Sequence, residues 1–135
     1  MKLLGFYLGL HDSNLSFYDG RVHYSKSERT SQVKHHRAGL QWVEDVCRQN
    51  DFAPDMIAFS DGNRNDLGIC IRGELSKAAR TLSICGKSIP TVCIDHHYAH
   101  TLSAWPVCSL TSADYGISID GRGDHNMRVS ILRNP

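Results

Sequence analysis

The sequence has no long hydrophobic run and no excess of charge of one sign. Its apolar start runs directly into His11 and Asp12, which is too soon for a transmembrane helix, and the small-residue cleavage site of a signal peptide is missing. Lysine and arginine number 15 against 14 aspartates and glutamates, which leaves a formal net charge of +1. Charge therefore gives no reason to expect a nucleic acid or a membrane as the main partner, whereas a small-molecule substrate stays open.

Cysteines are few and show no regular spacing. The sequence contains neither a C-x-x-C pair nor the regular cysteine spacing of a disulfide framework. It also lacks a Walker loop and a G-x-G-x-x-G fingerprint, and no catalytic Ser-His-Asp or Cys-His order can be recognised. Covalent catalysis is therefore not expected. Such cysteine usage predicts a cytoplasmic setting and small, buried core residues. The five cysteines are Cys47, Cys70, Cys85, Cys93 and Cys108.

The composition is that of one packed domain. The chain has 135 residues, of which 41% are hydrophobic and 21% charged. It is therefore long enough to form a stable core without disulfide bonds or metal ions. The first part alternates apolar runs with turn signals: LLGFYLGL, HDSN, LSFY, Asp19-Gly20 and RVHYSK. Because an Asp-Gly pair between two such runs predicts a hairpin, we expect three antiparallel strands here.

Helical and strand patterns alternate through the rest of the chain. Apolar residues recur at helical spacing in LQWVEDVCRQN and again from Leu67 to Leu82, which predicts two helices. MIAFS and IPTVCI have the continuous apolar character of buried parallel strands. A third helix is expected after Asp95, a good capping residue, with Pro106 limiting its far end.

This order predicts an α/β fold: a mixed sheet that contains an antiparallel three-strand meander and is covered by helices. The segments YGISI and MRVSIL form a last hairpin. A lone two-stranded hairpin is marginal in water, so it either joins the edge of the first sheet or begins a second lobe.

Three histidines fall within the segment IDHHYAHTLSAWP. On a helix, His96 and His100 lie four apart and His97 and His100 lie three apart, so either pair can grip one cation. A carboxylate would complete a face of two histidines and one carboxylate, and Asp120, which ends an apolar strand, is the obvious candidate. Such a pair also occurs as ordinary polarity at a helix start.

Three other stretches carry chemistry of lower specificity. In DGRGD, the glycines let the backbone approach a phosphate closely, and Arg122 is a candidate to bind an oxyanion. Alternatively, the glycines only provide the positive φ angles of a hairpin turn. In LHDSN, His11 is a candidate general base or substrate contact, although these residues are also common in turns. Lys34 lies in a charged stretch that either binds phosphate or carboxylate or is a solvated loop.

Taken together, three segments resemble a known family. They are LGLHDSNLSFYDGRVHYSKSERTSQVKHHRAG, IDHHYAHTLSAWP and YGISIDGRGD. In order and spacing they are similar to the N-terminal half of the O-carbamoyltransferases of antibiotic and nodulation-factor biosynthesis (the NodU/CmcH type). The resemblance covers nearly all of this chain and well under half of such an enzyme.

The resemblance implies a fold and a division of the chain. The family's N-terminal domain belongs to the actin/sugar-kinase-like (ribonuclease H-like) superfamily, whose two lobes each open with a three-stranded meander. It implies a first lobe over residues 1–110 and the opening hairpin of an incomplete second lobe over 111–135. A further domain of such enzymes activates carbamoyl phosphate with ATP, so the missing lobe and that domain would come from another chain.

The resemblance also implies roles for individual residues. The motif H-H-x-x-H-A makes His96 and His100 the ligands of an iron or zinc ion, while D-G-x-G-E/D makes Asp120 the third. His97 then becomes a neighbour rather than a ligand. His11 is implied to accept the proton of the hydroxyl that receives the carbamoyl group. The implied substrate-binding residues are Asp12, Lys34, Gly121, Arg122 and Gly123.

Two other interpretations remain. One is a non-catalytic subunit that binds metal or ligand and pairs with a separate chain, or forms a homo-oligomer through the unpaired edge of its last hairpin. The other is a member of the related tRNA-modifying branch, which shares the H-x-x-x-H pair but lacks the HDS opening.

Overall fold

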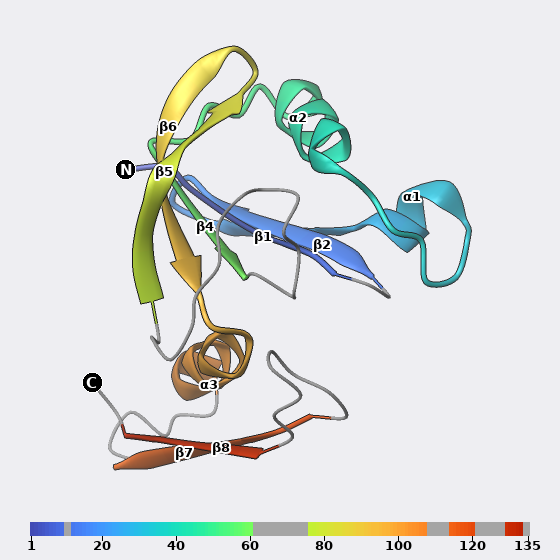
Figure 1. Ribbon diagram of the computed structural model, residues 1–135. Coiled ribbons are helices and arrows are strands. Elements are labelled where there is room, and N and C mark those ends of the chain that lie inside the picture. The colour runs from blue at the N-terminus through green and yellow to red at the C-terminus, as the bar shows by residue number, and fades with distance from the viewer. Residues whose placement is uncertain (10–11, 61–75, 108–113, 121–128, 134–135) are drawn as a thin grey trace.

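The computed structural model describes residues 1–9, 12–60, 76–107, 114–120 and 129–133 (Figure 1). Within these residues the chain forms two sheets and three helices. Among the same residues, no helix combines the length and the hydropathy needed to cross a bilayer. The elements are β1 (Leu3–Leu8), β2 (Ser13–Tyr18), β3 (Val22–Lys26), α1 (Ser27–Ser31), α2 (Leu40–Gln49), β4 (Met56–Ser60), β5 (Ser76–Ile84), β6 (Lys87–Ile94), α3 (His96–Val107), β7 (Tyr115–Ile119) and β8 (Val129–Arg133).

The larger sheet is mixed, with the strand order β3-β2-β1-β4-β6-β5. Strands β1, β4 and β6 are parallel, while β2 and β3 on one side and β5 on the other are antiparallel to their neighbours. The predicted α/β class and the opening meander are therefore confirmed. Since β1, β4 and β6 run the same way, their carboxyl ends lie along one edge of the sheet, the usual location of ligand sites in such sheets.

The core lies on one face of this sheet because its strands alternate buried and half-buried residues. Helix α2 covers that face with Val43, Val46 and Cys47, all buried at helical spacing. The cross-strand rows beneath it are Phe17, Leu4, Ile57 and Thr91, and Leu15, Phe6, Phe59 and Cys93.

Helix α3 lies on the opposite face of the sheet, and the two-stranded sheet β7–β8 lies beyond it (Figure 1). The register pairs Tyr115 with Arg133 and Ile119 with Val129. In the described residues the hairpin packs on α3 and does not extend the larger sheet. The expectation that it joins the edge of the first sheet is therefore wrong.

The predicted second helix is wrong over its last part. Residues 76–84 form β5, and the part before residue 76 lies outside the described residues. Cys85 and Gly86 make a two-residue turn in which both have positive φ angles, 50° and 77°, and Ile84 pairs with Lys87. Such turns match the twist of a hairpin, so pairing with β6 overrides the helical spacing. Near the turn, Ile84 is buried and Ser83 exposed, as expected in a strand.

The prediction that every cysteine is a core residue is confirmed for Cys47 and Cys93, which are buried. It is wrong for Cys85, which is exposed because it lies in the β5–β6 turn. Cys70 and Cys108 lie outside the described residues.

Candidate metal centre

Helix α3 begins where β6 ends, at the edge formed by the carboxyl ends of the parallel strands. Asp95 caps it as predicted: its Oδ1 accepts a hydrogen bond from the Tyr98 N–H at 2.9 Å. The carbonyl of Asp95 accepts the Ala99 N–H at 2.8 Å. The cap fixes the start of the helix at His96 and therefore places the histidines of the first turn at this edge.

Three predicted ligands come together at this point. The Nε2 atom of His96 lies 2.7 Å from Oδ2 of Asp120 and 3.1 Å from Nε2 of His100. The third side of the triangle, from His100 Nε2 to Asp120 Oδ2, measures 3.6 Å. His96 and His100 come from successive turns of α3, whereas Asp120 follows β7, so packing of the hairpin on the helix assembles the group.

A single proton on Nε2 of His96 cannot make a well-aligned hydrogen bond to both neighbours. The Nε2 of His96 carries either one proton or one lone pair. With a proton it donates to Asp120, and His100 must then accept from it as well; with a lone pair it faces the carboxylate oxygen without a proton between them. A cation inside the triangle would satisfy all three atoms at once.

The dimensions of the triangle fit a transition-metal ion. Bonds of about 2.1 Å place neighbouring ligand atoms about 3.0 Å apart in octahedral geometry and about 3.4 Å apart in tetrahedral geometry. The three separations of 2.7, 3.1 and 3.6 Å span these values. Two imidazoles and one carboxylate are a donor set suited to zinc or to iron(II) with open positions.

The surroundings of His100 favour the form that binds metal. Burial and the neighbouring His96 lower the pKa of His100 below its usual value, although Asp120 opposes this effect. This shift favours the neutral imidazole of His100, the form that binds a metal ion. The His96 side chain is only 13% exposed, and its ring lies against Tyr7 of β1 with the ring centroids 5.3 Å apart.

His97 points away from this group. Its side chain is buried, and Nδ1 lies 2.6 Å from the hydroxyl of Ser130 on β8. The spacing of the sequence left His97 open as a ligand together with His100; in the structure it instead ties α3 to the hairpin that carries Asp120.

A second group of possible ligands lies beside the β1–β2 turn and consists of Asp12, Glu28 and His35. Lys26 occupies the same place: its Nζ lies 2.8 Å from Glu28 and 3.7 Å from Asp12. The hydrogen bond with Glu28 raises the pKa of Lys26 and lowers that of Glu28. Because an ammonium group already neutralises these carboxylates, this group is a poorer cation site than the first.

The remaining predicted site residues are placed only in part. Asp12 faces Lys26 and His35, and its backbone carbonyl closes the turn by accepting the Gly9 N–H at 3.0 Å. Lys34 is exposed and lines an open cavity together with Glu28, Arg29 and Gln32. The predictions for His11, Gly121, Arg122 and Gly123 lie outside the described residues.

Three residues that contact these two groups of side chains were not expected from the sequence: Tyr7, Lys26 and Ser130. Tyr7 could have been found, because alternation along β1 places it near the carboxyl end on the face opposite Phe6 and Leu8. The other two have no local signal. Lys26 pairs with Asn14 across β2 and β3, and Ser130 contacts α3 only after the hairpin has packed.

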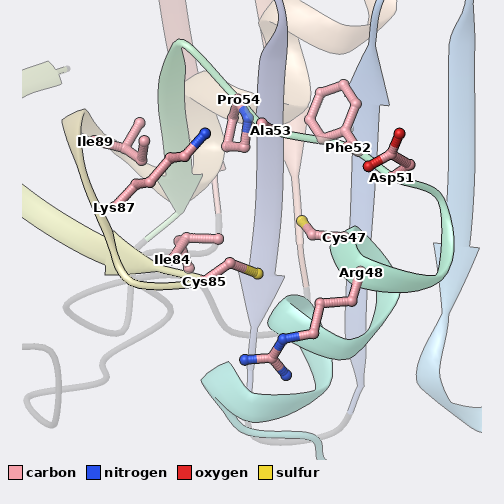
Figure 2. A pocket seen from close by; sticks show the side chains of 10 residues that line it. All are labelled: Cys47, Arg48, Asp51, Phe52, Ala53, Pro54, Ile84, Cys85, Lys87 and Ile89. Atoms are coloured by element: carbon pink, nitrogen blue, oxygen red, sulfur yellow. The ribbon is translucent and has the colours of Figure 1, made fainter.

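A separate cavity of about 160 Å³ lies between the end of α2, residues 51–54 and the β5–β6 turn (Figure 2). Figure 2 shows Cys47 of α2 and Cys85 of the turn on its walls. Burial, with smaller effects of Cys85 and Glu44, raises the pKa of the Cys47 thiol to about 11. Cys85 is exposed, and its thiol lies 3.6 Å from the carbonyl oxygen of Glu44.

We expect iodoacetamide at pH 8 to alkylate Cys85 at least about 100-fold faster than Cys47, because the reactive species is the thiolate and Cys47 is both buried and mostly protonated. Trypsin separates the two residues, so mass spectrometry of the digest after timed labelling measures both rates. In urea the two rates should become similar. Equal rates in the native protein would contradict the packing of α2 on the sheet.

No family model, curated protein or solved structure matches the chain.

Proposed function

We propose that this chain binds one iron or zinc ion through His96, His100 and Asp120 and is the metal-binding part of an O-carbamoyltransferase. The observation that carries the metal site is the position of His96 Nε2, within 3.1 Å of both other ligand atoms. The assignment to carbamoyl transfer rests on the family resemblance and on the location of the site.

The location supports a ligand site. Asp12, between the end of β1 and the start of β2 at Ser13, lies next to the carboxyl end of β1, and α3 follows the carboxyl end of β6. Both strands flank β4 and run parallel to it, so Asp12 and the metal centre share one edge of the sheet. Substrates of open α/β sheets bind at this edge.

The three side chains would hold the ion from one side and leave its other positions to a substrate. When bound, the ion supplies Lewis-acid polarisation of a carbamoyl or phosphate oxygen. The chain's own residues orient the site: Asp95 fixes the start of α3, the Tyr7 ring supports His96, and the bond between His97 and Ser130 holds the hairpin with Asp120. We assign to His11 the acceptance of the proton from the attacking hydroxyl.

Two measurements on the purified chain test the two parts of this proposal. Metal analysis should find close to one iron or zinc per chain, and cobalt(II) added to the metal-free protein should give the visible absorption of a nitrogen- and oxygen-ligated ion. Isothermal titration calorimetry should then detect carbamoyl phosphate binding to the metal-loaded chain, more tightly than inorganic phosphate and with no heat from the metal-free chain.

The outcomes separate the parts. If no metal binds, the whole proposal is wrong. If metal binds but carbamoyl phosphate does not bind better than phosphate, the metal centre stands and the assignment to carbamoyl transfer is wrong.

A further inference from the structure

The outer face of the β7–β8 sheet is apolar and exposed. Residues alternate between its two faces, so that every second residue of each strand points away from α3. The outward residues of the hairpin are 54–78% exposed, although all are large and apolar: Tyr115, Ile117, Ile119, Val129 and Ile131.

The opposite face of the β7–β8 sheet packs on α3. Ser118, which alternates with the outward residues, is buried, and Ser130 contacts His97 of α3. Both β7 and β8 contact α3. The exposed residues therefore belong to a second face that nothing in the described part of the chain covers.

The cross-strand register concentrates these side chains into one patch. Ile117 lies directly opposite Ile131, and Ile119 opposite Val129. From the exposed fractions, the patch offers roughly 600 Å² of apolar surface, the upper end of what monomers leave in one place. Asp114 and Arg133, both exposed, lie at one end of it, so that the apolar patch has a charged border at this end, as is common at the rim of protein interfaces.

We propose that this face is the contact surface of a homodimer, in which the outer faces of two β7–β8 sheets pack on each other. Two copies would bury roughly 1,200 Å² in total, the lower end of the range for specific interfaces. A two-fold contact needs a surface that complements itself. This face meets that condition, because the two strands present nearly the same branched side chains opposite each other, and such faces pack as in a β-sandwich.

The proposal does not depend on the metal centre. It predicts a weak dimer with a dissociation constant of about 10 µM, as expected for a small apolar interface. Sedimentation equilibrium of the full chain between about 1 and 200 µM measures this directly. The experiment is repeated with EDTA, because a dimer bridged by metal through surface histidines would disappear under that condition.

Two substitutions place a charge at the centre of the patch: Ile117→Lys and Ile131→Lys. Each should make the chain monomeric throughout this range, because lysines from both copies would meet in an apolar contact. The matched control is Val22→Lys, which changes an exposed apolar strand residue on β3, 76% exposed, and should leave the dimer intact. Circular dichroism checks that each variant keeps its fold, as expected for positions that face solvent in the monomer.

A wild-type chain that stays monomeric at about 200 µM, some twentyfold above the expected dissociation constant, overturns the proposal. So does a dimer that survives both lysine substitutions, or one that EDTA abolishes. Growth into species larger than a dimer also overturns it, since it would indicate pairing through the open strand edges.

Discussion

Replacing His96 or His100 by alanine, or Asp120 by asparagine, should each lower the affinity of the chain for zinc by about 100-fold or more. The reason is that all three ligand atoms converge within 3.6 Å of one another, so each substitution removes one of three protein ligands. Competition with a chromophoric chelator measures the dissociation constant of each variant.

The chain offers controls of the same residue types. Asp114→Asn changes an exposed carboxylate at the start of β7, and His35→Ala changes an exposed histidine in the group beside Lys26. Both should leave zinc affinity within about twofold of the wild type, since surface substitutions away from a site have small effects. If His35→Ala abolished binding and His96→Ala did not, the ion would belong to the other group and the proposed centre would be wrong.

Ile57→Ala should destabilise the protein by about 3 to 4 kcal/mol, a large part of the roughly 5–15 kcal/mol that stabilises a domain. Ile57 is fully buried in β4 and lies between Leu4 of β1 and Thr91 of β6, beneath α2. Removing its branched side chain leaves a cavity that the two flanking strands cannot close. The free energy of unfolding is measured by urea denaturation.

The control for this substitution is the preceding residue. Met56 is in the same strand but 41% exposed, so Met56→Ala should cost less than about 1 kcal/mol. Similar losses at the two positions would show that β4 does not alternate between a buried and an exposed face, and would contradict the register of the larger sheet.

Local patterns were sufficient for much of the fold. Alternation of apolar residues and the Asp19-Gly20 turn predicted β1, β2 and β3, and helical spacing predicted α2. The Asp95 cap was predicted for the same reason. Each of these features depends on residues a few positions apart, so the sequence states it directly.

The failure at β5 has the opposite cause. From Leu67 to Leu82 the apolar residues are at helical spacing, yet residues 76–84 pair with β6. The strand is stabilised by hydrogen bonds to another strand, and spacing within the segment does not contain that information. The one local signal was the Cys85–Gly86 turn, whose positive φ angles suit a hairpin.

In the candidate metal centre, too, local spacing predicted one part and only the tertiary structure decided the other. The sequence by itself determined that two histidines lie on one face at the start of a helix, because helix geometry places residues three or four apart together. Spacing alone left open whether His96 or His97 pairs with His100, and the family resemblance favoured His96 together with Asp120. Only the tertiary structure turned His97 toward Ser130 and brought Asp120 within 2.7 Å of His96, since that contact spans 24 positions and exists only when the hairpin packs on α3.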